Sequence, residues 1–134
     1  MKRVRKYIRG KREKTPKERD YKQALIFSRH VQFTKAEMAK CAAWLAIASA
    51  NEVKTKQAPI FQQWSRMGQK KVVLRVENVE QLEKIEEECK KRKIVVLRAP
   101  TSLLEGKNEE LYALGIGPQN ENVINQVVGH LKLI

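Results

Sequence analysis

Cysteine and histidine are scarce in this chain, which limits the chemistry it can perform. Its 134 residues include two cysteines and two histidines. Cys41 and Cys89 lie far apart, and both fall on the apolar side of a helical pattern, so we expect two buried free thiols rather than a disulfide. Without a CxxC pair or a cluster of histidine and cysteine, the sequence gives no basis for a metal site. We also expect no small-molecule cofactor.

Long apolar runs are missing too. The most apolar stretch, Met38–Ala50, is too short to cross a bilayer and contains Lys40, so it predicts a buried core helix and no membrane association. The first 20 residues lack the apolar core of a secretory signal. They are arginine-rich, as mitochondrial presequences are, but Pro16 and three acidic residues argue against a presequence. The compartment, mitochondrial or cytoplasmic, stays open.

Acidic residues are in short supply as well. The chain has 28 Lys and Arg against 15 Asp and Glu, a net charge of +13. Residues 1–20 have too few apolar groups to fold alone. We predict that they form a basic, intrinsically flexible RNA-binding arm, because arginine matches the geometry of phosphate. A solvated tail that only aids solubility is the alternative. The ten cationic residues of the arm are Lys2, Arg3, Arg5, Lys6, Arg9, Lys11, Arg12, Lys14, Lys17 and Arg19.

Residue periodicity predicts strands that alternate with helices. The strands are expected over 22–28, 70–76, 94–97 and 111–116, and the helices over 34–50, 60–66, about 79–89 and 119–129. Thr34-x-x-Glu37 fits a capping box at the start of the first helix. Three consecutive apolar residues, Val72 to Leu74, indicate a strand covered on both faces. We therefore predict a single α/β domain over residues 21–134, with a mixed four-stranded sheet sandwiched by helices.

The C-terminal quarter carries the most specific pattern, Leu114-Gly115-Ile116-Gly117-Pro118. We expect Pro118 to open the last helix, since its missing N–H would be unpaired there. Gly129 should end that helix in a left-handed cap, followed by His130, packed at the helix end, and an apolar tail. Together with Trp64 and the string Gly68-Gln69-Lys70-Lys71-Val72-Val73-Leu74, this pattern resembles the type II peptidyl-tRNA hydrolases over about residues 21–134. The resemblance implies that family's fold, a tRNA partner, and hydrolysis of the ester between peptide and tRNA.

The same resemblance shows that the family's polar site residues are replaced. The typical lysine-glycine-lysine motif, whose second lysine is thought to belong to the active site, reads Lys35-Ala36-Glu37 here. A following glutamine and histidine are Cys41 and Trp44. The carboxylate of Glu37 already has a structural use in the capping box, and Lys40, one turn further on, is the candidate substitute for the lost ammonium.

The loop expected over residues 98–110 departs further from the family pattern, Asp-Ala-Gly-x-Thr-Gln. In the family, the aspartate of this pattern helps to orient or activate water. Neither this aspartate nor the threonine of the pattern has a polar counterpart here. The loop does contain the hydroxyls of Thr101 and Ser102, but without a base they are weak nucleophiles. Pro100 stands at the aspartate position (Ala99 after a one-residue shift), and Leu104 (or Leu103) stands at the threonine position. Tyr112 replaces a later threonine of the family. His30, which we expect to be exposed, replaces an aspartate near the first strand.

These features favour an RNA-binding, ribosome-associated structural protein on a degenerate peptidyl-tRNA hydrolase fold. Its partner would be rRNA or tRNA, within a ribosomal particle. The alternative is a divergent but active peptidyl-tRNA hydrolase, and a third option is a protein-interaction adaptor with an apolar pocket in place of the site. A homodimer stays open. Besides the arm, the lysines expected to contact RNA are Lys35, Lys40, Lys70, Lys71 and Lys107.

Overall fold

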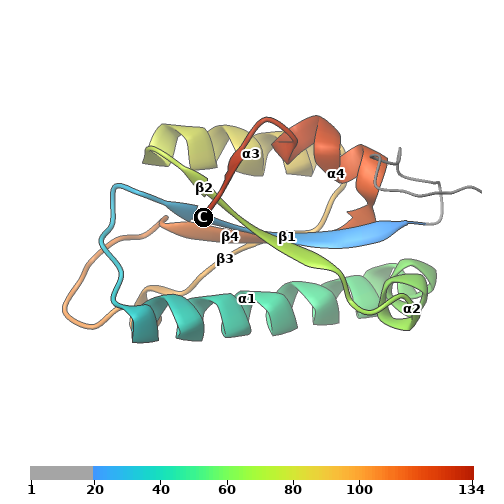
Figure 1. The fold of residues 1–134 in the computed structure, drawn as a ribbon, viewed down its shortest axis with the longest axis horizontal. Coiled ribbons are helices and arrows are strands. Elements are labelled where there is room, and N and C mark those ends of the chain that lie inside the picture. Colours follow the sequence, from blue (N-terminus) through green and yellow to red (C-terminus); the bar gives the residue numbers. More distant parts are fainter. Residues whose placement is uncertain (1–19) are drawn as a thin grey trace, which may run out of the picture.

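The computed structural model describes residues 20–134, and the ten cations of the arm lie outside them. Ten elements follow one another along the described chain (Figure 1). They are β1 (Tyr21–Ser28), α1 (Lys35–Lys56), α2 (Ala58–Arg66), β2 (Lys71–Val76), α3 (Val79–Lys91), β3 (Val96–Arg98), a 3₁₀ turn (Thr101–Leu103), β4 (Ala113–Asn120), α4 (Glu121–Val128) and β5 (Lys132–Leu133).

The strands form one mixed sheet in the order β3-β4-β1-β2-β5. β1 and β2 run parallel, and the other neighbouring pairs are antiparallel. Helices α1 and α2 cover one face of the sheet, and α3 and α4 cover the other (Figure 1). The predicted α/β sandwich is thus confirmed in kind, with five strands rather than four.

The fifth strand is the apolar tail. Leu133 lies opposite Leu74 of β2, and the Ile134 N–H donates to the Val73 carbonyl at 3.1 Å. The tail thereby pairs an edge of β2 that would otherwise expose unpaired backbone groups. Two residues are too few to show a strand period in the sequence, which is why the prediction stopped at four strands.

The expectation that Pro118 opens the last helix is wrong. β4 continues through Pro118 to Asn120, and it is the Asn120 side chain that caps α4, accepting from the Asn122 N–H at 2.9 Å. Pro118 lies where the register between β4 and β1 shifts, opposite the segment from Lys22 to Ala24. A strand tolerates proline at such an irregularity because no ladder hydrogen bond is needed from it there.

Three further expectations need correction. Gly129 is right-handed, with φ of −63°, rather than a left-handed cap. Its lack of a side chain matters for another reason, since a Cβ there would lie 2.5 Å from the Asn125 carbonyl oxygen. His130, expected to be packed, is exposed. α1 runs to Lys56, beyond the predicted end near Ala50; the prediction stopped short because Val53 is the only apolar residue in these last turns.

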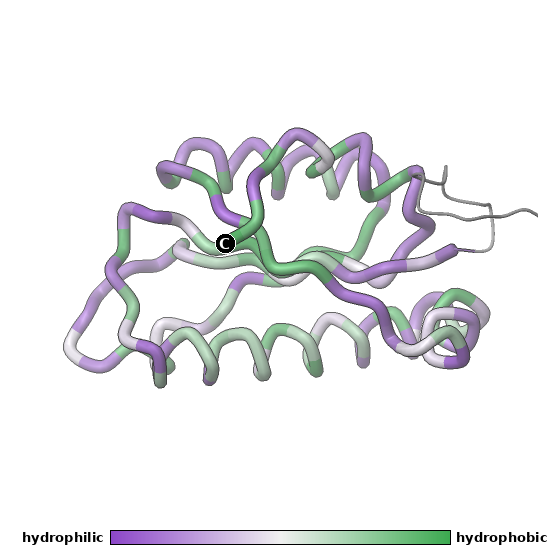
Figure 2. The backbone as a smooth tube through the Cα atoms, in the orientation of Figure 1, coloured by the Kyte–Doolittle hydropathy of each residue, from purple (hydrophilic) through white to green (hydrophobic). Residues whose placement is uncertain are grey.

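Apolar side chains form one cluster on each face of the sheet. Val72 and Leu74 of β2 pack with α3 and α4, whereas Val73 packs with the cluster beneath α1, as expected for a strand covered on both faces. Figure 2 shows the apolar colour concentrated along the central strands and α1. Cys41 and Cys89 are both buried free thiols, as predicted. Within residues 20–134, no helix combines the length and the apolar character that a membrane crossing requires.

The approach of α1 to the sheet depends on Gly115 of β4. A Cβ at this position would lie 3.1 Å from Leu45 Cβ and 3.2 Å from the Leu45 carbonyl oxygen. Leu45 is fully buried on the inner side of α1. A side chain at residue 115 would therefore push the helix away from the strand that leads out of the loop 99–112.

We expect Gly115→Val to lower the free energy of unfolding by about 1–3 kcal/mol, the usual cost of overpacking a filled core. Urea denaturation followed by circular dichroism measures this change. Ala39→Val is the matched control, since Ala39 is exposed on the same helix; its cost should stay within the difference in helix propensity, below about 0.7 kcal/mol. Equal stability of the Gly115→Val and unmodified proteins would contradict the close packing described here.

Candidate functional site at the start of helix α1

The positions expected to hold site residues come together between α1 and the loop after β3. Glu37 and Cys41 lie on the first turns of α1, Pro100 and Leu104 in the loop, and Tyr112 just before β4. Hydrogen bonds join Glu37 to the backbone N–H of Glu105 and Tyr112 to the Pro100 carbonyl. The positions predicted to hold site residues are therefore neighbours in the structure.

The Glu37 carboxylate clamps the loop onto the helix. Its side chain accepts from the Thr34 N–H at 3.0 Å and from the Glu105 N–H at 3.1 Å, and Lys107 Nζ lies 2.8 and 2.9 Å from its two oxygens. The reciprocal bond from the Glu37 N–H to Thr34 Oγ1 completes the predicted capping box.

These contacts also settle the protonation state of Glu37. The hydrogen bond from Lys107, followed by the one from the Thr34 backbone, lowers the pKa of the carboxyl to about 2. At neutral pH the group is ionised and its oxygens are engaged by donors from the helix cap and the loop. A carboxylate of such low basicity is a poor general base, because an efficient base has a pKa near the working pH.

Tyr112 and Cys41 form a second buried contact in the same cluster. The Tyr112 hydroxyl donates to the Pro100 carbonyl at 2.6 Å and lies 3.5 Å from Cys41 Sγ. Burial raises the pKa of the Cys41 thiol and also that of the Tyr112 phenol. Both groups therefore stay neutral at physiological pH, and neither supplies an anionic nucleophile.

Apolar side chains fill the remaining space. Leu104 is 4 % exposed and belongs to the cluster beneath α1, together with Phe27 and Ala99. Leucine and tyrosine side chains therefore occupy this part of the structure.

Lys40 and the loop hydroxyls lie at the edge of the cluster. Lys40 Nζ is 3.6 Å from a carboxylate oxygen of Glu105, and both side chains are largely exposed. Thr101 and Ser102 are exposed in the one-turn 3₁₀ helix, as expected for turn residues. Lys40 thus neutralises a surface acid next to the loop.

A contact that sequence reasoning missed ties the end of β1 to the same loop. His30 Nδ1 hydrogen-bonds Ser28 Oγ, and His30 Nε2 lies 3.1 Å from Glu109 Oε1. The order serine, histidine, carboxylate is that of a hydrolytic triad, and Ser28, although only 1 % exposed, borders the cavity at the ends of β1 and β2. The arrangement braces the loop, and His30 is exposed as predicted.

A cationic cavity lies on the other flank of α1, at the ends of the parallel strands β1 and β2. Its volume is about 350 Å³, and its lining includes Phe33, Met38, Arg29 and Arg75. The Arg75 Nε–H is buried and has no hydrogen-bond partner within the described part of the chain. The half-buried Arg75 guanidinium therefore suits an anionic ligand, whereas Arg29 lies 3.7 Å from a carboxylate oxygen of Glu77. The sequence signal that could have shown this site is a lone arginine inside the apolar strand 71–76.

The five lysines expected to contact RNA fall into two groups. Lys40, Lys70 and Lys107 each lie within 4 Å of a carboxylate, on Glu105, Glu121 and Glu37 respectively. Lys35 and Lys71 are exposed and have no acidic partner among residues 20–134. They lie at opposite ends of the sheet, since Lys35 follows the end of β1 and Lys71 pairs with its start. The five lysines therefore do not form one continuous surface.

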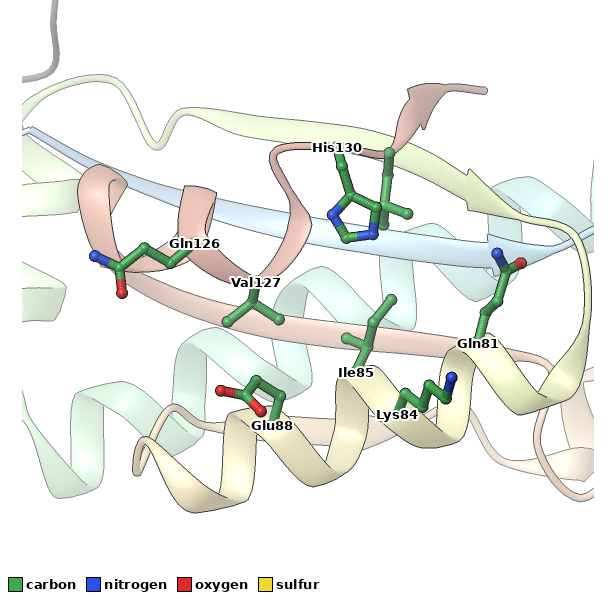
Figure 3. Close-up of a pocket in the computed structure, with 8 residues that line it drawn as sticks. Gln81, Lys84, Ile85, Glu88, Gln126, Val127 and His130 are labelled. Atoms are coloured by element: carbon green, nitrogen blue, oxygen red, sulfur yellow. The ribbon is translucent and has the colours of Figure 1, made fainter.

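A further groove, between α3 and α4, is separated from this region by the sheet (Figure 3). Its volume is about 360 Å³. His130 stands at its rim, and Glu88 on its wall is paired with Arg92 at 2.7 Å. Among residues 20–134, no three His, Cys, Asp or Glu side chains gather closely enough to hold a metal ion.

Comparison with known proteins agrees with this architecture. The profile of the family described as "Peptidyl-tRNA hydrolase PTH2" matches residues 21–134. The peptidyl-tRNA hydrolase of Thermococcus onnurineus is 32% identical over 120 residues, covering 85% of this chain and 98% of the relative. That of Staphylothermus marinus is 32% identical over 116 residues, covering 86% and 96%. Human mitochondrial peptidyl-tRNA hydrolase 2 is 27% identical over 120 residues, covering 85% and 64%.

The mixed sheet between two helical layers, with the loop 99–112 folded over the start of α1, is thus the domain of a known class of tRNA-directed proteins. The chain belongs to the peptidyl-tRNA hydrolase PTH2 family.

We expect Glu37→Gln to weaken the fold in a pH-dependent way. The pKa of Glu37 is about 2 in the folded protein, against an ordinary value of 4.5. The ionised carboxylate therefore stabilises the fold above about pH 4.5, and this contribution is lost as the pH falls towards 2. The variant should have a lower denaturant midpoint at pH 7, and its difference from the unmodified protein should shrink through this range.

Glu110→Gln is the control for this experiment, because Glu110 is an exposed carboxylate of the same loop. Its substitution should change the midpoint little at any pH. A Glu37→Gln deficit that stays constant from pH 7 to pH 2 would contradict the clamp.

Proposed function

We propose that this protein is a non-catalytic, RNA-binding member of the PTH2 family that associates with a ribosomal particle through rRNA or tRNA. The observation that carries the loss of catalysis is the Glu37 clamp. A carboxylate held by Lys107 and by two backbone N–H groups occupies the place of the family's active-site lysine.

The electrostatics support an RNA partner. The net charge of +13 on 134 residues favours association with a polyanion. More than half of that charge falls in residues 1–20, and the cavity lined by Arg75 adds a cation on the folded domain. These cations suit backbone phosphates, whose contacts position a protein without reading sequence.

The second candidate function is a divergent but active peptidyl-tRNA hydrolase. It is favoured by the relatives of that name, which match along nearly their whole length. It would require a base and an oxyanion donor other than the replaced residues, with Lys40 as the candidate cation. The two functions differ in turnover, which can be measured directly.

We expect the purified protein to cleave peptidyl-tRNA at least ~100-fold more slowly than an intact relative, because loss of a general base or of an oxyanion donor typically costs about 10²–10⁴-fold each. Diacetyl-lysyl-tRNA is a suitable substrate, and the Thermococcus onnurineus relative is the positive control. Restoring turnover should need more than one change, for example Glu37→Lys together with Pro100→Asp. Turnover by the unmodified protein at the relative's rate would establish the second candidate instead.

Deleting residues 1–20 should weaken RNA binding and its dependence on salt. An arm that contacts about five phosphates gives a log–log salt slope of roughly −3.5 to −4.5, and the truncated domain should show a much shallower slope. Fluorescence anisotropy with a labelled RNA at several KCl concentrations measures both slopes. The truncated protein should also leave ribosomal particles at moderate salt in sedimentation experiments. Unchanged affinity and slope after truncation would show that the arm serves solubility alone.

A further inference from the structure

One continuous segment of the domain contains no acidic residue. Between Glu52 and Glu77 the chain has neither Asp nor Glu, but it has six cations: Lys54, Lys56, Arg66, Lys70, Lys71 and Arg75. The fold builds the end of α1, all of α2 and β2 from this segment. Lys56 and Lys70 pair with Glu52 and Glu121. Within residues 20–134, no carboxylate lies within ion-pair distance of Lys54, Arg66 or Lys71.

Two of these three cations stand over aromatic rings. Lys71 Nζ lies 5.3 Å from the centre of the Trp64 ring, and Lys54 Nζ lies 5.4 Å from that of Phe61. The two rings are neighbours, with centroids 5.9 Å apart, and the Trp64 indole N–H donates to the Lys70 carbonyl at 2.7 Å. The rings hold the ammonium groups in place while both lysines stay exposed to solvent. We call Lys54, Arg66 and Lys71, with these two rings, the α2 patch.

The α2 patch lies at the end of the sheet from which the arm departs. Gln23 of β1 is in register with Lys71, and the Gln23 N–H donates to the Lys70 carbonyl at 3.0 Å. Figure 1 shows the start of β1 and helix α2 at the same end of the molecule. Since residues 1–20 join the domain at this point, the most basic part of the sequence and the acid-free segment meet there.

Helix α3, on the opposite face, is mildly acidic. It carries five glutamates against three lysines (Lys84, Lys90 and Lys91), a formal charge of −2; the glutamates are Glu80, Glu83, Glu86, Glu87 and Glu88. A polyanion that approaches the domain is therefore repelled by the α3 face and attracted to the α2 face. This asymmetry gives the bound RNA one preferred side.

We propose that the α2 patch is a contact surface for the RNA phosphate backbone, continuous with the arm. The proposal rests on the RNA-binding function proposed above and specifies which face of the domain carries it. Three exposed cations at this surface neutralise up to three phosphates. Lys35, Lys40 and Lys107, at the far end of the sheet, are not part of the contact.

The test compares two full-length triple variants of equal net charge. Lys54→Gln/Arg66→Gln/Lys71→Gln removes the patch, whereas Lys84→Gln/Lys90→Gln/Lys91→Gln removes three cations from α3. Binding to labelled oligouridine is measured by anisotropy at several KCl concentrations. Loss of three phosphate contacts on single-stranded RNA should make the salt slope shallower by about 2. The α3 variant should keep the slope of the unmodified protein.

Two further measurements guard against a folding defect. Lys54→Arg/Lys71→Arg keeps both charges and should keep the salt slope. The unmodified protein, irradiated with 4-thiouridine-containing RNA, should give crosslinked peptides from residues 53–76. Equal slopes for the patch variant and the unmodified protein, equal losses in the two triple variants, or crosslinks confined to other segments would each overturn the α2 patch while leaving RNA binding intact. Failure of the unmodified protein to bind oligouridine and ribosomal RNA would instead overturn the proposed function.

Discussion

The ion pair between Glu37 and Lys107 is the contact on which the arrangement around α1 depends. It joins the first turn of the helix to a loop that the Tyr112 hydroxyl anchors at its other end. The same carboxylate caps the helix, so one side chain closes the N-terminus of α1 and fixes the loop. A lysine at position 37 would face Lys107 and leave the Thr34 and Glu105 N–H groups without their acceptor. The clamp therefore requires an acidic acceptor at position 37.

Charge outside the clamp is separated between the layers rather than spread evenly. Helix α3 concentrates glutamates, while the segment between Glu52 and Glu77 has none. The fold converts this separation along the sequence into a separation in space, because α2 and α3 cover opposite faces of the sheet (Figure 1). The paired lysines at the edge of the loop show why a count of cations is a poor guide to a binding surface. Lys40 and Lys107 are positive in sequence but are matched by acids that the fold brings to them.

Much of this structure follows from local patterns in the sequence, and the failures have definite physical causes. Three features depend on neighbours in sequence, and each was predictable. They are the capping box at Thr34, the helical spacing from Val79 to Cys89, and the alternate packing of Val72 to Leu74. The path of Pro118 and the pairing of β5 depend on partners far along the chain. The same holds for the site: the roles assigned to Glu37, Pro100 and Tyr112 stay predictions, and the salt bridge from Lys107 and the contact of His30 with Glu109 come from long-range folding.

The residues of the cluster at the start of α1 support one another. Pro100 supplies the carbonyl that the Tyr112 hydroxyl needs, and Tyr112 in turn contacts Cys41. Leu104 fills the space beside them, and Glu37 holds the adjacent loop residues. Buried polar groups are stable only when each has a partner, and here the polar groups of the cluster do. Family membership therefore accounts for the fold of this chain, while its chemistry has to be inferred from the contacts at the start of α1.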